Sequence, residues 1–220
     1  MLCAGSVRKK NTQNTMLKNL LDACGAAVAY FCVGYAFSFG GDYSSRNGTT
    51  ELAETGTTFV GLENFFAIGI TDLPFFFFQY TFTAASVTIV AGTLAERCQM
   101  AAYLCYSFFL TGFVYPVVCH AVWSSAGFLS SSNSNPVLDM GMVDFSGSGV
   151  IHVTGGSTAL IATYILGSRR GRFYDVTTGA PLTVPKAFPG HSVSLQILGS
   201  FILWFGCKLG ELSCILPSVI

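Results

Sequence analysis

Charged residues are scarce in this 220-residue sequence. It has 11 lysines and arginines, 11 aspartates and glutamates, and charged residues make up only 10% of the chain. Soluble domains carry about 25% charged residues, so the composition does not predict a soluble domain. The formal net charge is zero, which leaves no basic surface of the kind that binds nucleic acid. We therefore expect no nucleic-acid partner.

Motifs for disulfides and cofactors are also missing. The 8 cysteines are scattered, no two of them form a CxxC pair, and none lies in the two long polar loops. The sequence therefore predicts no disulfide framework and no cofactor, and most cysteines are expected to pack as small apolar side chains. The chain starts with MLCAGSVRKK, whose apolar run is too short to predict a cleavable signal peptide.

Apolar residues are abundant: they make up 51% of the chain, with 20 phenylalanines, and the mean hydropathy is +0.57. This composition predicts an integral membrane protein. The expected fold class is all-α, a polytopic bundle of transmembrane helices. After Gly206 the run CKLGE places two charges where the last helix would continue. The five expected spans lie near residues 20–39, 74–95, 100–125, 145–167 and 192–206, followed by a tail over 207–220.

Basic residues alternate along the chain and predict its orientation. Of the 11 lysines and arginines, all but Arg46 and Lys208 lie in segments 1–18, 96–97 and 168–190. Cytoplasmic loops carry the excess of basic residues. Segments 1–18 and 168–190 are therefore expected in the cytoplasm, with 1–18 solvated beside the membrane. Loops 40–73 and 126–143 are expected outside, where Asn47 would be an available glycosylation sequon.

The stretch from Asp144 to Gly167 has no formal charge between Asp144 and Arg169. Its length suits a helix crossing a hydrocarbon core of about 30 Å, at about 1.5 Å per residue. Asp144 is expected to cap this helix, with the field of its carboxylate on cations as a second effect. His152 follows eight residues later, about 12 Å along a helix, near the middle of the bilayer. An imidazole at that depth indicates either a role in a substrate pathway or a hydrogen bond between helices.

Two further polar or aromatic residues lie near the same end. Trp123 closes the third span, where its indole could attract a cation or anchor the helix at the membrane interface. His120, three residues earlier, is interpreted as a polar packing residue. If His120 and His152 instead lay at matched depth, a membrane haem protein would be a remote alternative.

Several runs carry specifically spaced motifs, including AER, H-x-x-W and D-F-x-G-x-G-x-x-H. They are FFFFQYTF (75–82), GTLAERCQMAAYLCYSFFLTGFVYPVVCHAVW (92–123), MVDFSGSGVIHVTGG (142–156), GSRRGRF (167–173) and GHSVSLQILGSFILWFG (190–206). Together with residues 1–26, these runs resemble the ammonium transporter (Amt/Mep/Rh) family across residues 1–206. The resemblance is strongest to its plant and algal branch.

The resemblance implies a fold of eleven transmembrane helices, of which about five are present here, and a homotrimer with one pathway per subunit in the lipid bilayer. It implies a transporter rather than an enzyme, carrying ammonium or methylammonium across what would be the plasma membrane. In the family, ammonium is recruited at an outer aromatic site, passes a phenylalanine gate, is deprotonated, and moves past two histidines. By motif, Trp123 matches the recruiting tryptophan, Phe82 a gate phenylalanine, Asp144 the aspartate of the outer site and His152 the first pore histidine.

The match to the family stops after Gly206. The second gate phenylalanine, a serine of the outer site and the second pore histidine have no counterpart in the sequence. We therefore expect an incomplete chain that cannot transport ammonium alone. The alternatives left open are an inert product, a subunit that interferes with intact relatives by co-assembly, and an ammonium sensor.

Overall fold

The computed structural model describes residues 1–41 and 57–215. Over these residues the secondary structure is helical, and β-pairing is limited to isolated bridges. The expected all-α fold class is therefore confirmed. Asn47, the expected glycosylation sequon, lies outside the described residues. Short elements outside the long helices are α1 (Leu2–Ser6), η4 (Phe65–Ala67) and η6 (Val137–Asp139).

Four helices in the described part of the chain are long and apolar enough to cross a membrane. The first runs without a break over Lys9–Phe39 and the third over Met100–Trp123. A fifth helix, α8, has an apolar part, Val193–Lys208, that is shorter than the other four. The elements are η1 (Lys9–Asn11), α2 (Thr12–Ala29), η2 (Tyr30–Gly34) and α3 (Tyr35–Phe39); α4 (Leu73–Leu94); α5 (Met100–Phe109), η5 (Leu110–Val114) and α6 (Tyr115–Trp123); η7 (Ser148–Val153) and α7 (Thr154–Leu166); and α8 (Val193–Ile215).

Helix α8 does not end at Gly206, where the apolar pattern stops, but continues to Ile215. The segment that follows Gly206 contains lysine, leucine and glutamate, which favour helix. The first proline after it is Pro217, and a helix usually ends before the residue that precedes a proline. Local propensity therefore extends the helix into a segment whose charges broke the apolar pattern.

The contacts between Cα atoms divide the chain into two compact units. Unit 1 comprises Met1–Leu21, Thr88–Tyr103 and Gly156–Ile220, and unit 2 comprises Asp22–Val87 and Leu104–Gly155.

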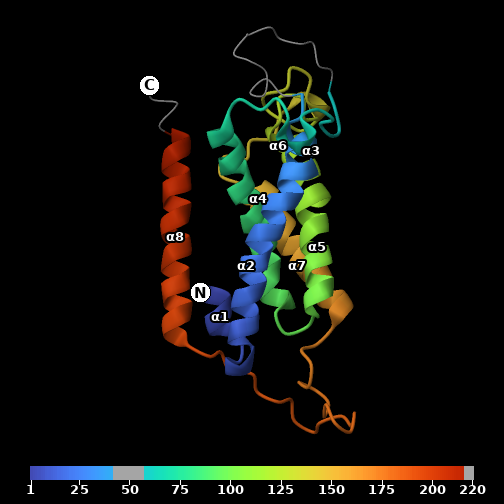
Figure 1. Cartoon of the computed structure of the whole chain (residues 1–220), viewed down its shortest axis with the longest axis vertical. Coiled ribbons are helices and arrows are strands. Elements are labelled where there is room, and N and C mark those ends of the chain that lie inside the picture. The colour runs from blue at the N-terminus through green and yellow to red at the C-terminus, as the bar shows by residue number, and fades with distance from the viewer. Residues whose placement is uncertain (42–56, 216–220) are drawn as a thin grey trace. The chain divides into compact units, whose positions relative to one another are not determined.

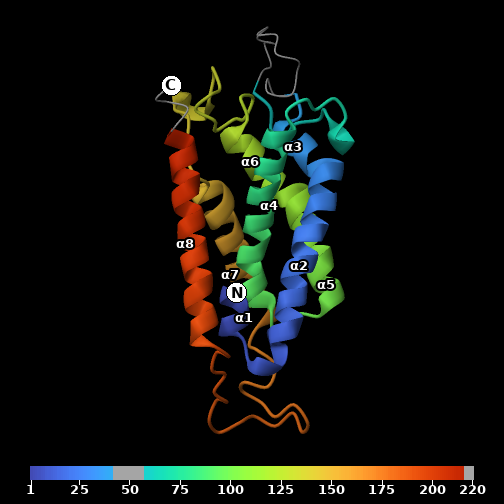
Figure 2. The ribbon, with the colours of Figure 1, turned by 60° about the vertical axis from the view of Figure 1, so that its left-hand side comes forward.

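In unit 1, α1 lies against the first turns of α8, as the two views of the ribbon show (Figures 1 and 2). The carbonyl of Gly5 accepts hydrogen bonds from Ser192 N at 3.2 Å and from Gln196 Nε2 at 2.9 Å. A Cβ atom at Gly5 would lie 2.7 Å from the Ser192 carbonyl oxygen. Such a small residue lets the two helices approach closely.

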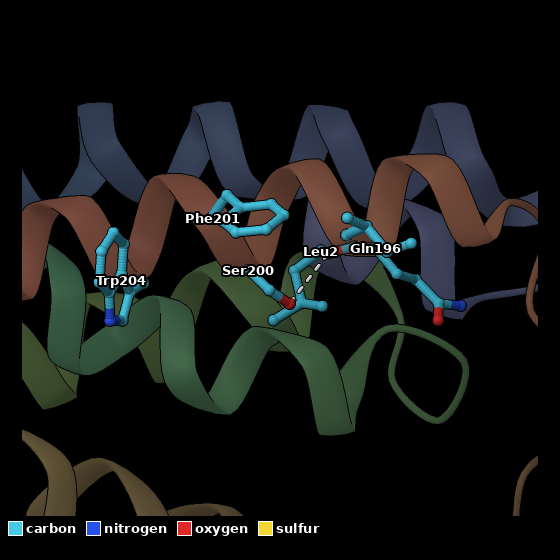
Figure 3. A pocket seen from close by; sticks show the side chains of 6 residues that line it. Leu2, Gln196, Ser200, Phe201 and Trp204 are labelled. Atoms are coloured by element: carbon cyan, nitrogen blue, oxygen red, sulfur yellow. Dashed lines mark hydrogen bonds between the residues drawn. The ribbon is translucent and has the colours of Figure 1, made fainter.

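The α1–α8 contact leaves an open groove of about 490 Å³ (Figure 3). Ser200 Oγ donates to the Gln196 carbonyl at 2.9 Å, so that its polar group is satisfied within the helix. Phe201 and Trp204 remain 64% and 61% exposed. This face of α8 is therefore apolar and uncovered in the part of the chain that the structure describes.

The expectation that segment 1–18 is solvated holds for Lys9 and Lys10, which are exposed, but not for the buried positions of the segment. Thr15 and Lys18 are each only 1% exposed. Lys18 Nζ donates to the Cys98 carbonyl at 2.9 Å and lies 5.0 Å from the centre of the Tyr103 ring. A lysine can be buried when its ammonium has such partners and its methylene stem packs on apolar groups.

Unit 2 has a core of buried aromatic residues where α3 and α6 meet (Figure 1). Tyr30, Tyr35 and Tyr115 are fully buried. A Cβ atom at Gly34 would lie 2.8 Å from the Thr111 carbonyl oxygen. Both Gly34 and Thr111 lie in π-helical turns, η2 and η5. π turns occur mostly as single turns inside α-helices, and here the two turns contact each other.

Candidate substrate-pathway site

The four residues expected in the substrate pathway all lie in unit 2. Phe82 belongs to α4 and Trp123 is the last residue of α6. Asp144 precedes η7, and His152 lies within it. The structure joins Phe82, Trp123 and Asp144 by direct contacts, and His152 lies in the helical turns that Asp144 caps.

Asp144 caps the helix that begins at Ser148. Its Oδ1 accepts from Gly147 N at 2.9 Å and Ser148 N at 2.8 Å. Its Oδ2 accepts from Gly149 N and Val150 N, both at 2.8 Å. The first N–H groups of a helix have no partner within it, so a single carboxylate here satisfies four backbone donors. The capping role inferred from the sequence is confirmed.

The helix begins three residues later than the span expected from residue 145. Gly147 has φ +84°, a left-handed conformation that glycine adopts without steric cost. This turn folds the backbone N–H groups around the Asp144 carboxylate before the helix starts. His152 is consequently the fifth residue of the helix, about 6 Å along its axis rather than about 12 Å.

Trp123 is held in place from two sides. Its Nε1 donates to the Asp144 carbonyl at 2.7 Å. Its ring centre lies 5.6 Å from that of Phe82, at an interplanar angle of 46°. Trp123 is half-buried, so part of the indole is accessible while its orientation is fixed. A cation over such a ring gains about 0.5–2 kcal/mol, depending on desolvation.

The carboxylate of Asp144 can act on a cation through its electric field rather than by direct coordination. Both carboxylate oxygens are engaged by backbone N–H groups, so the carboxylate is not free to coordinate a ligand directly. Its negative charge offsets the partial positive charge at the start of the helix. The carboxylate therefore reduces the repulsion that the helix N-terminus alone would exert on a cation.

His152 is exposed. Over residues 1–41 and 57–215 its ring makes no hydrogen bond, so the alternative of an interhelical hydrogen bond finds no support. An exposed imidazole with two unengaged nitrogens is able to donate or accept a proton or a hydrogen bond.

His120 is a packing residue, as expected. It is 1% exposed, its Nδ1 lies 2.9 Å from the Ser38 carbonyl, and its Nε2 lies 2.8 Å from Thr58 Oγ1. A carbonyl oxygen only accepts, so Nδ1 donates to the Ser38 carbonyl, while Nε2 pairs with the threonine hydroxyl. Because both nitrogens are engaged, His120 is not available to bind a haem iron, and the haem alternative loses one of its two ligands.

Sequence reasoning missed two features of the structure, one in each unit. Phe78 packs on Phe82, with ring centres 4.5 Å apart. The spacing of four residues on one helix is a signal that could have predicted this pair. Glu96 seemed only to interrupt the apolar pattern, yet its side chain is 1% exposed and is bound by Arg8 and Arg169. Those partners are 88 and 73 residues away, and no local pattern predicts them.

Replacing Trp123 by phenylalanine tests the hydrogen bond that orients this ring. The ring contact with Phe82 can remain, but the Asp144 carbonyl loses its donor, so W123F should lower the free energy of unfolding by about 1 kcal/mol. The control is W204F, because Trp204 is 61% exposed and its replacement should change stability by less than about 0.5 kcal/mol. Thermal unfolding of the two variants in detergent makes the comparison. Equal effects would contradict the orienting role of the bond.

The fold and the site together define the class. Apolar helices long enough to cross a bilayer, with an aromatic and acidic cluster at the ends of two of them, describe an integral membrane protein of the polytopic helical type. The model of the Ammonium Transporter Family matches residues 1–207. The chain belongs to this family.

Named relatives agree with this assignment and with the resemblance to the plant branch. The chain is 48% identical over 208 residues to ammonium transporter 1 member 1 of rice (Oryza sativa subsp. japonica), covering 94% of this chain and 39% of the relative. It is 46% identical over 206 residues to ammonium transporter 1 member 4 of Arabidopsis thaliana, covering 93% and 38%. Its fold matches the crystal structure of Candida albicans Mep2 with a TM-score of 0.61 and 28% identity, covering 87% and 39%. The chain thus spans about two fifths of the length of these proteins.

Proposed function

We propose that this chain builds one side of an ammonium transport pathway. Ammonium is recruited at Trp123 and Phe82 beside the capped carboxylate of Asp144, loses its proton, and continues past His152. The observation that carries the proposal is the contact of the oriented Trp123 ring with both Phe82 and the Asp144 carbonyl. Membership of the ammonium transporter family supports the choice of substrate.

The proposed steps follow from elementary electrostatics. An aromatic face attracts a cation through its quadrupole, and the field of Asp144 adds to that attraction. When ammonium moves from the mouth into an apolar passage, desolvation penalises its charged form and lowers its pKa. The ion therefore gives up its proton, a ring nitrogen of His152 accepts it in our proposal, and neutral ammonia continues. The unengaged ring nitrogens of His152 are suited to hydrogen-bond ammonia and to hand on a proton.

The proposed orientation places segments 1–18 and 168–190 in the cytoplasm and loops 40–73 and 126–143 outside. The excess of basic residues in segments 1–18 and 168–190 supports this orientation, because cytoplasmic loops carry such an excess. Trp123 and Asp144 then lie at the outer mouth. We assign the protein to the plasma membrane and to a homotrimer when the full pathway is present, on the strength of the family resemblance.

We propose that this chain alone does not conduct ammonium. Two observations support this: His152 is exposed, and the chain spans only 39% of a rice relative that carries the transporter name. In our proposal a complete pathway has a further wall that covers the exposed face of η7. Desolvation of ammonium needs such a wall, since an open imidazole faces solvent or lipid instead of a closed passage.

A chimera tests the proposed function. Residues 1–206 replace the matching segment of the rice relative, and methylammonium uptake is measured in yeast that lacks its own ammonium transporters. We expect the chimera to transport methylammonium and this chain alone to give only background uptake. An inactive chimera that reaches the membrane would contradict the proposed function. If this chain lowers methylammonium uptake by a co-expressed rice relative, it acts as an interfering subunit.

Replacing His152 and replacing His120 should have different effects on uptake and on stability. In the chimera, H152A should lower uptake by about tenfold or more, since it removes the proposed proton-handling group. In this chain alone, where His152 is exposed, it should change stability by less than about 0.5 kcal/mol. H120A should instead lower the free energy of unfolding of this chain by about 2–3 kcal/mol, since it removes a buried side chain and leaves the Ser38 carbonyl without its His120 donor. Its uptake per folded protein should be retained. Uptake and thermal unfolding are measured on both variants, and the reverse pattern would contradict the assignment.

A further inference from the structure

A polar pocket of about 460 Å³ lies in unit 1, around the loop between α4 and α5. Four cationic side chains line it and Glu96 is the one acid in its lining, so positive charge is in excess. The charged lining residues are Arg8, Lys10, Glu96, Arg97 and Arg170, with Asn11 beside them.

Glu96 does not neutralise this excess, because it carries one negative charge against four positive charges in the lining, and both of its oxygens are already engaged. Oε1 accepts from Arg8 Nε at 2.9 Å and Asn11 Nδ2 at 2.6 Å. Oε2 accepts from Arg169 Nη1 at 3.3 Å. The carboxylate thus fixes one wall of the pocket and is matched by two arginines. Arg8 is held further by the Phe188 ring, whose centre lies 3.7 Å from its guanidinium carbon.

The other three cationic side chains of the lining have N–H groups that are not engaged in hydrogen bonds within the described residues. Lys10 and Arg170 are exposed, and neither side chain has a partner among the residues that the structure describes. Arg97 uses Nε on the Gly167 carbonyl and Nη1 on the Thr93 carbonyl, which leaves its Nη2 group. Ammonium and guanidinium donors that line one pocket are suited to bind phosphate oxygens by charge-assisted hydrogen bonds.

The pocket lies where an apolar helix ends and the next begins. Helix α4 ends at Leu94 and α5 begins at Met100, while the pocket is built on residues 95–99 between them. In a bilayer this position is the membrane–water boundary, the depth of lipid phosphates. In the proposed orientation it faces the cytoplasmic leaflet, which carries the anionic lipids. Basic pockets at helix ends on that side are suited to lipid headgroups.

We propose that this pocket binds a phosphate group, and that its source is the headgroup of an anionic membrane lipid. The charge and donor arguments hold for any phosphate, whether esterified to lipid or soluble. The position at the boundary favours the lipid. Only the choice of leaflet rests on the proposed orientation, and binding itself does not depend on ammonium transport.

The test uses the purified chain in detergent, titrated with phosphatidic acid and, separately, with inorganic phosphate, with bound lipid counted by native mass spectrometry. K10Q/R170Q removes the two unpartnered cations, and we expect it to weaken phosphatidic acid binding about 20-fold. The matched control is K9Q/K186Q, which removes the same charge from two residues outside the pocket lining. K10R/R170K keeps the charge and should retain binding, and circular dichroism confirms that all variants stay helical.

The outcomes separate the possibilities. A selective loss in K10Q/R170Q, with inorganic phosphate unable to compete, supports the lipid headgroup. Competition by inorganic phosphate with the same dependence on Lys10 and Arg170 keeps the phosphate site but overturns the lipid as its source. Equal weakening in both double variants, or no weakening in either, overturns the site, since binding would then reflect only the overall charge of the chain or an unrelated surface. These results are independent of methylammonium uptake.

Discussion

Asp144→Ala is expected to lower the free energy of unfolding by about 3 kcal/mol. The substitution removes the acceptor of four backbone N–H groups, at 2.8–2.9 Å. Two of these groups belong to the buried residues Gly147 and Val150, and a buried donor left unsatisfied costs about 1–3 kcal/mol. The other two, in Ser148 and Gly149, are more accessible and can turn to water. The sum exceeds the usual loss of about 1 kcal/mol for a helix cap, because this carboxylate serves more donors than an ordinary cap.

D144N separates geometry from charge. The amide oxygen of asparagine can accept from one pair of N–H groups, but its amide nitrogen would face the other pair as a second donor. We expect D144N to lose about 2 kcal/mol. Thermal unfolding followed by circular dichroism measures both variants. The control is D139N, which changes an exposed aspartate and should shift stability by less than about 0.5 kcal/mol. A loss in D144A no larger than in D139N would show that the cap does not hold the helix start.

Transport by the chimera adds a second readout at the same residue. If Asp144 only shapes the backbone, D144N measured at a temperature where it is folded should take up methylammonium as the parent chimera does. If its field also attracts ammonium, uptake should stay low at limiting substrate and recover at high substrate. We expect the second pattern, because the carboxylate carries a full charge beside the Trp123 ring although its oxygens are engaged.

Much of this site could be predicted from the sequence because it depends on local chemistry and on helix ends. Counting apolar spans places Trp123 and Asp144 at the same side of the bilayer, and the structure joins them by a hydrogen bond. A carboxylate before an apolar run predicts a cap, which the structure confirms. The later helix start could not be predicted, because it depends on Gly147 adopting a positive φ, and glycine is equally compatible with the helix continuing.

The burial of charged residues could not be predicted from the sequence. Lys18 lies in a polar segment and Glu96 in a short break between two apolar spans, and charged residues at such positions beside a membrane are usually solvated. Their burial depends on partners far along the chain: the Cys98 carbonyl for Lys18, and Arg8 and Arg169 for Glu96. No periodicity links such residues, since the pairing arises only when three segments of unit 1 meet.

Glu96 carries the second large expected effect. It joins the N-terminal segment, the loop between α4 and α5 and the segment after α7 through Arg8, Asn11 and Arg169. E96A would leave a buried cluster of donors without its acceptor. Breaking a buried ion pair costs about 3–5 kcal/mol, but Arg8 and Arg169 are 20% and 28% exposed and water can reach them. We therefore expect a loss of about 2–3 kcal/mol.

The same contacts predict a pH dependence with a definite sign. Burial alone raises the pKa of the Glu96 carboxyl, but the hydrogen bonds from Arg8 and Asn11 outweigh it, so the pKa lies below its ordinary value of 4.5. The folded state thus prefers the ionised carboxylate. Its contribution to stability is complete above the unfolded pKa and is lost as the pH falls through the lower folded pKa.

E96Q makes this dependence measurable, because glutamine keeps one acceptor and cannot ionise. The difference in the free energy of unfolding between the parent chain and E96Q should be constant from about pH 7 to pH 5.5 and should shrink below about pH 4.5. The control is E63Q, since Glu63 is exposed and its replacement should change stability by less than about 0.5 kcal/mol. Unfolding is followed by circular dichroism in detergent at each pH. A difference that grows as the pH falls would contradict a lowered pKa, because it would mean that the fold prefers the protonated carboxyl.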